Sequence, residues 1–315
     1  MAVTLTQLRY LVAIADVRHF TRAADLVGVT QPTLSRQLKA LERELGATLV
    51  DRGARDGPAL TAAGAALLPL ARRMLADLDS ARTAVAEIVG LRRGRVRVGA
   101  TPSLCMGVLA DVLRVFHGRH PEVRLELEES GSRPLVRALV RGELDIALVI
   151  APATGIDPAL ESTPLLRERL SVASAADQAL SGRGSVTVRE LARRPLVVPR
   201  TGYDVRETTL RAFDDAGVAP RFAVQGGEMD AVLRLVEAGT GVAVVPDLVF
   251  AGRPGLRRTV LTPPLYRTVA LARRADLVPS HAVRAFTDTL LSFLAALSGE
   301  LPGDVQVLGR ADGAL

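Results

Sequence analysis

Residues 20–45, FTRAADLVGVTQPTLSRQLKALEREL, decide the fold of the N-terminal region, because they predict two helices joined by a tight turn. Thr21 stands where the first helix needs an N-cap, and Gly28 can end that helix in the left-handed conformation at little cost. Thr30 offers a second N-cap, and Pro32 falls in the first turn of the next helix, where its missing N–H costs nothing. Leucines at helical spacing predict a buried stripe on that helix, formed by Leu34, Leu38, Leu41 and Leu45.

The second helix of this pair carries a polar and basic face opposite its leucines. Its first residues project from the helix tip, which is how a recognition helix presents side chains to base edges in the major groove of DNA. An ordinary pair of helices with a solvated polar face is the simpler alternative, and any one of these features alone would favour it. Together the features favour a DNA-binding face over a merely solvated one. The candidate DNA-binding residues of the two helices are Thr21, Arg22, Thr30, Gln31, Pro32, Thr33, Ser35, Arg36 and Lys39.

A short segment after Gly46 predicts a two-stranded wing. Its sequence, LVDRGARDGPALT at 49–61, places glycines and a proline between two short apolar ends. Arg52 and Arg55 lie near the predicted tip, and beside a recognition helix they would contact phosphates or the minor groove. A solvated turn is the alternative for both arginines. Residues 1–60 are therefore expected to form a winged helix-turn-helix domain.

Three stretches of the N-terminal region resemble one known family: LTQLRYLVAIAD, TQPTLSRQLKALERELGATLVDR and LTAAG. Over roughly the first ninety residues the chain is similar to the winged helix-turn-helix of LysR-type transcriptional regulators. The resemblance implies a sequence-specific DNA-binding regulator, more often an activator than a repressor, whose activity a small-molecule effector modulates. The partners that it implies are promoter or operator DNA, the effector, RNA polymerase, and copies of the same chain in a dimer or homotetramer.

Residues 61–89 predict one long amphipathic helix. Apolar or small residues recur at the a and d positions of a heptad. Such a stripe on a small domain needs a partner, either within the chain or on a second copy, and the resemblance implies the second copy. Because LRRGR at 91–95 breaks the heptad, we interpret residues 61–93 as a linker helix followed by a hinge. The expected dimerisation residues are Leu67, Ala71, Met74, Leu78 and Val85.

From residue 94 onward, strand-like and helix-like segments alternate. This alternation predicts an α/β domain with a mostly parallel sheet and helices on both faces. The resemblance implies two Rossmann-like lobes, similar to type 2 periplasmic binding proteins, with the effector between them. Residues 94–298 would form this effector-binding domain, and the chain would cross between the lobes near Pro164 and Thr268. The expected parts are lobe one (94–164 and 268–298), lobe two (165–267) and a disordered tail (299–315).

In open α/β sheets, ligands bind beyond the carboxyl ends of strands, where helix N-termini present free N–H groups. Ser103, Ser132 and Thr201 are the expected hydrogen-bond donors, and Arg200 could pair with an effector carboxylate. Each hydroxyl alone is better explained as a helix cap, but their convergence on one cleft favours a ligand. An apolar floor at Ile150 argues against dianionic or aromatic-acid effectors. The candidate effector-binding residues are Thr101, Ser103, Leu104, Gly131, Ser132, Ile150, Pro199, Arg200, Thr201, Tyr203, Gly226 and Gly227.

Composition narrows the function further. The 315 residues are 48% hydrophobic and carry a net charge of +6, which suits several globular domains and a polyanionic partner. No apolar run reaches about 18 residues and no signal-peptide pattern opens the chain, so a cytoplasmic protein is expected. No Walker loop, dinucleotide fingerprint, nucleophile elbow or HExxH motif occurs, so no cofactor, metal or enzyme activity is expected. The alternative is a solute-binding protein or an enzyme with a helical dimerisation module, which would need a secretion signal or a catalytic constellation.

Cys105 is the single cysteine of the sequence. It follows the first cleft loop, where a helix N-terminus could lower the pKa of a thiol and make it reactive. Without a second cysteine no disulfide can form within the chain, so a buried, inert thiol is favoured. His117 and His120 have helical spacing, but no neighbouring carboxylates or thiols support a metal site, and both are interpreted as surface residues.

Overall fold

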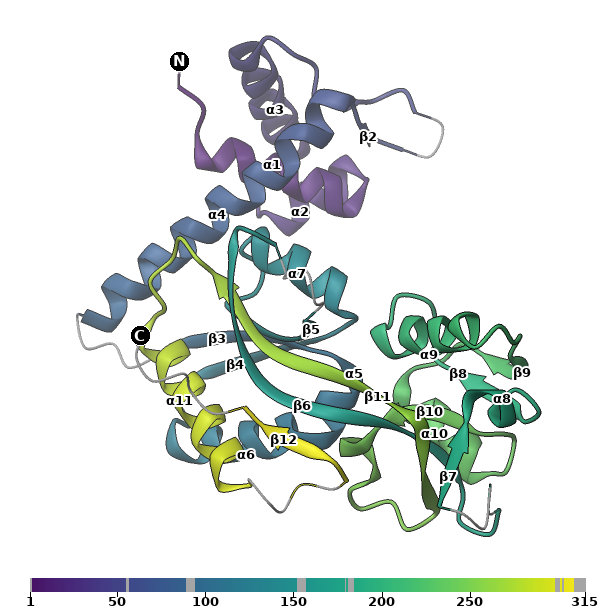
Figure 1. Cartoon of the computed structure of the whole chain (residues 1–315). Helices are drawn as coiled ribbons and strands as arrows, with labels where there is room; N and C mark the ends of the chain where they lie inside the picture. Colours follow the sequence, from purple (N-terminus) through teal and green to yellow (C-terminus); the bar gives the residue numbers. More distant parts are fainter. Residues whose placement is uncertain are drawn as a thin grey trace. The chain divides into compact units, whose positions relative to one another are not determined.

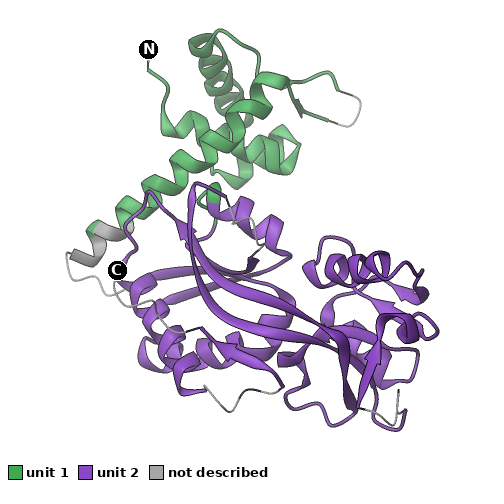
Figure 2. Cartoon of the chain, in the orientation of Figure 1, with its two compact units in different colours: residues 1–91, 140–143 green, residues 92–139, 144–315 purple. Residues whose placement is uncertain are grey.

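The computed structural model describes residues 2–54, 57–88, 94–151, 157–178, 180, 184–297, 301 and 303–308 (Figure 1). The chain divides into two compact units (Figure 2). The first unit comprises residues 1–91 and 140–143, and the second comprises residues 92–139 and 144–315.

The first unit is a winged helix-turn-helix. Its elements are α1 (Leu5–Val17), α2 (Phe20–Leu26), α3 (Gln31–Leu45), β1 (Val50–Asp51), β2 (Ala59–Leu60) and α4 (Ala62–Ile88). Strands β1 and β2 pair antiparallel and form the predicted wing. Apolar side chains of α1, α2 and α3 meet in one core, in which Leu11, Ala23 and Leu38 are fully buried. This core fixes α3 relative to the wing.

Local sequence signals set the ends of these helices. Gly28 follows α2 with a φ of 70°, and the Thr30 hydroxyl caps α3 by accepting a hydrogen bond from the Thr33 N–H at 3.4 Å. Thr21, however, is not the cap of α2. The helix begins two residues earlier than that cap predicts, and His19 caps it by accepting a hydrogen bond from the Arg22 N–H at 3.4 Å. The His19 imidazole is therefore the N-cap acceptor of α2, in place of the predicted Thr21 hydroxyl.

The leucine stripe of α3 is buried at Leu34, Leu38 and Leu41, as predicted. The prediction for Leu45 was wrong, because this side chain is 43% exposed. Leu45 is the last residue of α3, and Gly46 ends the helix there in the left-handed conformation, with a φ of 66°. The buried face of α3 therefore ends one turn earlier than the sequence pattern.

Helix α4 carries one apolar stripe whose two halves have different surroundings. Toward its N-terminal half, Ala71 is fully buried in the core of the first unit, and Leu67 packs against the same core. Ala71 was therefore wrongly predicted as a dimer contact, because packing within the chain already covers it. Leu70, just before Ala71, and Met74 and Val85, after it, expose 53%, 49% and 61% of their surface. Among the described side chains of α4, these are the large apolar ones that are exposed and free to contact another molecule.

The second unit is a two-lobed α/β domain. Its large sheet has the strand order β10-β6-β11-β5-β3-β4. Strands β4, β3 and β5 run parallel, whereas β6 and β11 run antiparallel to each other and to their outer neighbours, β10 and β5 respectively. The sheet is thus mixed, which corrects the prediction of a mostly parallel one. The strands are β3 (Arg95–Ala100), β4 (Arg124–Glu129), β5 (Ile146–Ala151), β6 (Leu160–Ala175), β10 (Ala243–Pro246) and β11 (Leu256–Arg274).

Helices and smaller strands complete the two lobes. Lobe one contains α5 (Pro102–Leu104), the π-helical η1 (Cys105–Leu109), α6 (Ala110–Arg119), α7 (Ser132–Val140) and α11 (His281–Ala296). Lobe two contains β7 (Ser185–Thr187), α8 (Val188–Leu191), β8 (Pro195–Val198), α9 (Asp204–Asp215), β9 (Arg221–Gln225) and α10 (Met229–Glu237). Strands β8 and β9 form a separate parallel pair, and the 3₁₀ turn η2 (Asp247–Phe250) follows β10.

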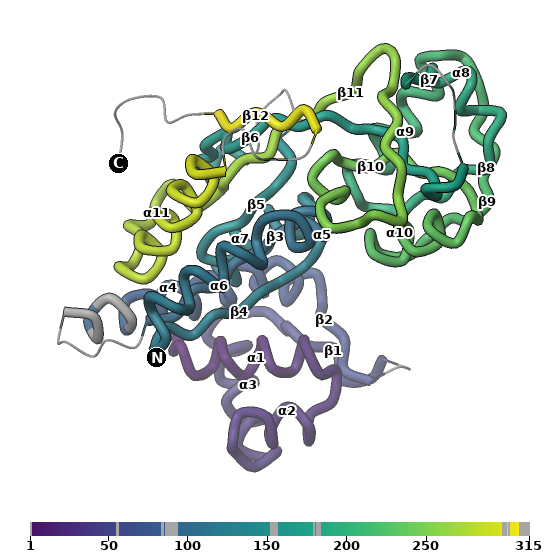
Figure 3. The backbone as a smooth tube through the Cα atoms, turned by 90° about the horizontal axis from the view of Figure 1, so that it is seen from below, coloured from purple at the N-terminus to yellow at the C-terminus, as the bar shows by residue number. Residues whose placement is uncertain are grey.

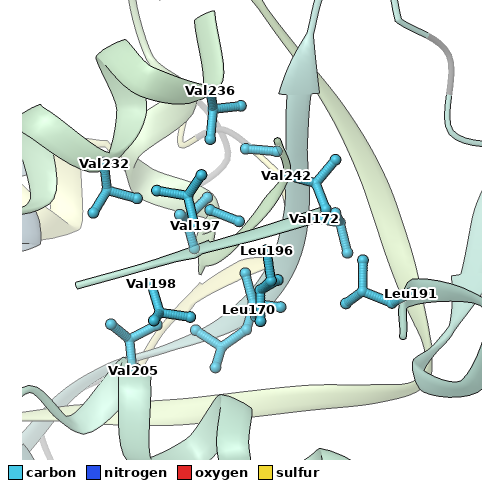
Figure 4. Close-up of a cluster of buried hydrophobic side chains, with 14 of the residues drawn as sticks. Leu170, Val172, Leu191, Leu196, Val197, Val198, Val205, Val232, Val236 and Val242 are labelled. Atoms are coloured by element: carbon cyan, nitrogen blue, oxygen red, sulfur yellow. The ribbon is translucent and has the colours of Figure 1, made fainter. Parts of the chain in front are cut away.

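Two separate hydrophobic cores define the lobes, and β6 and β11 pass from one to the other (Figure 3). Figure 4 shows the core of lobe two, where side chains of β6, β8 and α10 meet. On β6 the change of core falls between Leu166 and Leu170, and on β11 between Leu265 and Val269. These positions lie close to the expected crossings. The long strands are therefore the physical links between the lobes.

Part of the C-terminal segment is ordered, which corrects the expectation of disorder throughout 299–315. Strand β12 (Val305–Val307) pairs antiparallel with residues 166–168 of β6. The Asp304 carboxylate accepts a hydrogen bond from the Tyr266 hydroxyl at 2.9 Å, and Leu301 packs against the core of lobe one. These contacts with the domain, which the local Gly and Pro content does not predict, order the segment. Residues 309–315 lie outside the described part of the chain.

Candidate DNA interface and effector cleft

The tip of α3 presents the predicted DNA-binding side chains on an open groove. The groove, of about 990 Å³, follows α3 and the turn at 46–48. Its cationic lining residues are Arg36, Lys39 and Arg43, with Gln31 at the helix tip. This face can therefore offer cations to phosphates and hydrogen-bond donors to base edges. Of the predicted residues, those exposed are Thr21, Arg22, Thr30, Gln31, Pro32, Arg36, Lys39 and Arg52, and those half-buried are Thr33 and Ser35.

A carboxylate that the sequence did not single out ties the wing to α3. Glu42 accepts hydrogen bonds from the backbone N–H groups of Leu49 and Val50, at 2.9 and 3.3 Å. Arg52 donates to the Ser35 hydroxyl at 3.0 Å and lies over the Phe20 ring, 5.3 Å from its centre. These bonds hold β1 against the recognition helix, so the wing and the helix present one surface. Arg55 lies outside the described residues.

Loops of the two lobes meet at the carboxyl ends of their strands, as the topology rule predicts. They enclose a cavity of about 10 Å³, room for roughly one water molecule. Three of the predicted residues line it, namely Thr101, Ser103 and Tyr203. The other lining residues are Pro102, Asp204, Val205, Met229 and Arg267. The lobes lie close together here and leave only this small cavity between them.

A buried ion pair that sequence reasoning missed forms one wall of the cleft. Arg267 of β11 donates to one oxygen of Glu168, from Nε at 2.9 Å and from Nη2 at 2.7 Å. The same Nη2 donates to the Ser103 hydroxyl at 2.8 Å, and the other Glu168 oxygen accepts from the Leu248 N–H at 3.2 Å. Glu168 is fully buried, so its charge depends on Arg267 for compensation. The sequence signal that could have indicated this pair is a charged residue inside each strand that crosses between the lobes, Glu168 in β6 and Arg267 in β11.

A direct hydrogen bond joins the lobes at Ser132. Its hydroxyl accepts from the Ile150 N–H at 3.0 Å and donates to the Asp204 carboxylate of lobe two at 2.7 Å. Beside it, the backbones approach so closely that a Cβ at Gly131 would collide with the Gly202 carbonyl oxygen. Ser132 thus occupies the predicted position, but its partner in this form is a side chain of the protein. Sequence reasoning did not identify Asp204.

Arg200 is engaged with the protein itself rather than free for an effector. Its Nε donates to Glu228 at 2.7 Å, its Nη2 donates to the Tyr203 hydroxyl at 3.1 Å, and that hydroxyl donates in turn to Glu228. Thr201 is exposed and does not line the cavity. The remaining predicted residues that stand outside the cavity lining are Leu104, Gly131, Ser132, Ile150, Pro199, Gly226 and Gly227.

One polar atom in the cavity wall lacks a partner. The Thr101 hydroxyl is buried and makes no hydrogen bond to any described residue, and Thr101 as a whole is 4% exposed. Leaving a buried hydroxyl unpaired costs free energy that a bound water or ligand can recover. On the lobe-one side of the cleft, the Thr101 hydroxyl is therefore available for a hydrogen bond to a bound molecule.

The Cys105 thiol lies in an environment that suppresses ionisation. Partial burial and, second, the negative charge of Glu129 raise its pKa to about 12. Both effects disfavour the thiolate, which is the reactive form of cysteine. The interpretation of an inert thiol is consistent with this environment, although the side chain is only half-buried.

Cys105 is accordingly expected to react slowly with a disulfide reagent such as dithionitrobenzoate. At pH 8 a thiol with a pKa near 12 is ionised about a thousandfold less than one with the ordinary value near 8.5. Absorbance should show slow release of thionitrobenzoate from the native protein and fast release in guanidinium chloride. Equal rates in both conditions would contradict the assigned environment.

Within the part of the chain that the structure describes, no helix is long and apolar enough to cross a bilayer. Among the same residues, no three His, Cys, Asp or Glu side chains come together in a group that could hold a metal ion.

Comparison with known proteins gives matches over both units. The family described as "Bacterial regulatory helix-turn-helix protein, lysR family" matches residues 5–65, and "LysR substrate binding domain" matches residues 90–295. The uncharacterized HTH-type transcriptional regulator YnfL of Escherichia coli is 32% identical over 78% of this chain and 83% of its own length. A probable hydrogen peroxide-inducible genes activator of Mycobacterium avium is 33% identical over 78% of each chain. Full-length CbnR in complex with its target DNA has a TM-score of 0.66 and 25% identity, covering 92% of this chain and 100% of its own.

A winged helix-turn-helix followed in the chain by a two-lobed α/β domain with a cleft defines a ligand-responsive DNA-binding protein. The chain belongs to the LysR family of bacterial transcriptional regulators, because the family matches cover both of these parts. It is a DNA-binding transcriptional regulator with an effector-binding domain. Its relatives are named as transcriptional regulators and not as enzymes.

Proposed function

We propose that α3 reads base edges in the major groove while the wing contacts the DNA backbone. The observation that carries this proposal is the exposure of Gln31, Arg36 and Lys39 on one groove beside a wing tied to the same helix. Arg36 would read a base edge, since arginine donates in a fork that matches guanine. Lys39 and Arg52 would contact phosphates, which position the domain without reading sequence.

Arg36→Ala is expected to lower affinity for the operator by about 1–3 kcal/mol and to relax sequence preference at one base position. Fluorescence anisotropy with the intergenic DNA beside its own gene, and with unrelated DNA, at two salt concentrations would measure this. Binding that rests on phosphate contacts weakens steeply with salt for both DNAs, whereas the contribution of Arg36 should appear only with the operator.

Arg9 supplies a matched control, because it is an exposed arginine of α1 and its loss changes the charge equally. Arg9→Ala should leave the ratio of specific to non-specific binding unchanged. If Arg36→Ala kept the wild-type ratio, the assignment of α3 as the base-reading helix would be wrong.

We infer that the exposed part of the α4 stripe pairs with a second copy of the chain. Leu70, Met74 and Val85 are large apolar side chains exposed on one helix, and single-chain packing leaves them in water. A pair of winged domains would read two half-sites spaced by a helical turn of DNA or a multiple of it. Further contacts would build a tetramer.

The effector is proposed to bind between the lobes, near Thr101, Ser103 and Tyr203. The support is the cavity at the strand ends and the unpaired Thr101 hydroxyl in its wall. Because the lobes are already closed by direct bonds, an effector would compete with these bonds and change the angle between the lobes. A ligand can shift that equilibrium only by the difference between its affinities for the two forms.

We propose that the protein activates transcription through contact with RNA polymerase. Relatives named as inducible-gene activators support activation. Sensing of peroxide by Cys105 is not favoured, since oxidation requires a thiolate and the pKa of this thiol is raised to about 12.

A further inference from the structure

The charges around the cleft do not cancel. Arg267 is neutralised by Glu168 at hydrogen-bond distance, and Arg200 on the rim is neutralised by Glu228. Asp204 lines the cavity, and among the described residues no cationic side chain forms an ion pair with it. The cavity wall therefore carries one carboxylate without a cationic side-chain partner among the described residues, located at the first residue of α9.

Asp204 also accepts the hydrogen bond of the Ser132 hydroxyl, a donor that an anionic ligand would need. The Ser132 hydroxyl has one proton to donate, and it donates that proton to the Asp204 carboxylate at 2.7 Å. The same hydroxyl accepts from the Ile150 N–H at 3.0 Å, so its single proton is already committed within the protein. An effector carboxylate at this place would have to displace Asp204 and would meet its charge in a confined space, where repulsion is strong.

A second observation concerns hydrogen-bond acceptors in the cavity wall. The buried Thr101 hydroxyl has no partner, so a ligand group that can donate to its oxygen would be favoured there. The Ser103 oxygen already accepts from Arg267, but it keeps a lone pair. Met229 and Val205 supply apolar surface beside these groups. A donor-rich cationic head with an apolar body matches this lining.

We propose that Asp204 makes this cleft selective for effectors that carry a protonated amine and that it excludes carboxylates. This inference rests on the proposal that the effector binds between the lobes. The ammonium group replaces the Ser132 hydroxyl as the donor to Asp204 and donates a second hydrogen bond to Thr101. Since the closed cavity holds about one water, the ligand enters as the Ser132–Asp204 bond opens.

Matched small probes test the charge preference directly. Butylammonium and butyrate have apolar bodies of similar size, with four and three carbons, and opposite charges. Their binding to the full-length protein can be titrated by thermal shift and by saturation-transfer NMR at constant ionic strength. The wild type should bind butylammonium at least tenfold more tightly than butyrate. Asp204→Asn, which keeps a side chain of the same shape, should lose this preference and bind butyrate at least tenfold more tightly than the wild type does.

Asp215 provides the control, because it is an exposed acid at the other end of α9 and its substitution changes the net charge equally. Asp215→Asn should keep the wild-type preference. A wild type that prefers butyrate, or that shows no saturable binding of butylammonium, overturns the proposal. So does an Asp204→Asn variant whose preference is unchanged.

Two further variants separate this inference from the proposed function. Thr101→Val and Ser103→Ala alter the opposite wall of the cavity without changing its charge. If neither these variants nor Asp204→Asn affects binding of either probe, the ligand binds outside the cleft and the proposed function fails. If Thr101→Val weakens binding while Asp204→Asn leaves the amine-to-carboxylate ratio unchanged, the cleft is the ligand site and only the role of Asp204 is wrong.

Discussion

Met74→Glu is expected to convert the protein to a monomer and to abolish operator binding with it. The Met74 side chain is 49% exposed and lies at the middle of the free part of the α4 stripe, between Leu70 and Leu78. In a helix pair it would be buried against apolar side chains, where a carboxylate loses its hydration without gaining a partner. A cost of about 3 kcal/mol or more corresponds to a dimer dissociation constant raised by roughly 150-fold.

Sedimentation velocity at micromolar concentration measures the oligomeric state, and fluorescence anisotropy with operator DNA measures the consequence. Ala65→Glu is the matched control, since Ala65 is exposed on the side of α4 opposite Met74. It should keep the wild-type oligomeric state. A wild type that sediments as a monomer, or a Met74→Glu variant that sediments as the wild type does, would show that this surface is not the dimer interface.

The N-terminal unit could be predicted closely because local signals determine it. Helix ends follow from Gly28 and Thr30, whose conformations depend on their own residue types. Thr21 failed as a cap because His19, which hydroxyl-based rules overlook, offers an acceptor two residues earlier. The burial of Ala71 also depends on packing against the rest of the unit, which a heptad pattern does not encode.

The sheet of the second unit was harder to predict because its two longest strands carry polar side chains inside their buried faces. The alternation of strand-like and helix-like segments predicted an α/β domain, but the regions of β6 and β11 were interpreted only as places where the chain crosses between the lobes. Glu168 on β6 and Arg267 on β11 interrupt the apolar pattern and compensate each other across the sheet. A pairing between residues so far apart in sequence is not visible in either segment alone.

The position of the cleft could be predicted from the sequence, but the closure of the two lobes over it could not. The rule that ligands bind at the carboxyl ends of strands brought Thr101, Ser103 and Tyr203 to the cavity wall. What closes the cleft is a set of pairings between lobes, such as Ser132 with Asp204, that depends on tertiary structure. Arg200 likewise had its partner Glu228 in another loop of the same lobe.

Arg267→Met is expected to lower the free energy of unfolding of the second unit by about 3–5 kcal/mol. The substitution removes the cation that compensates Glu168, whose side chain is fully buried, and it also removes the donor to the Ser103 hydroxyl. Methionine fills much of the same volume, so the loss would come from the unpaired charge more than from a cavity. Urea unfolding of the full-length protein, followed by far-UV circular dichroism, would show the second-unit transition at lower denaturant.

Two further variants test the cause of this destabilisation. Arg257→Met changes an exposed arginine of the same strand and should alter the unfolding free energy by no more than about 0.5 kcal/mol. Combining Arg267→Met with Glu168→Leu removes both charges and should recover most of the loss, because a buried pair replaced by apolar side chains costs little. If the double variant were as unstable as Arg267→Met alone, the uncompensated Glu168 charge would not be the cause, and the lost contacts of Arg267 with Ser103 and the crossing strands would account for the effect.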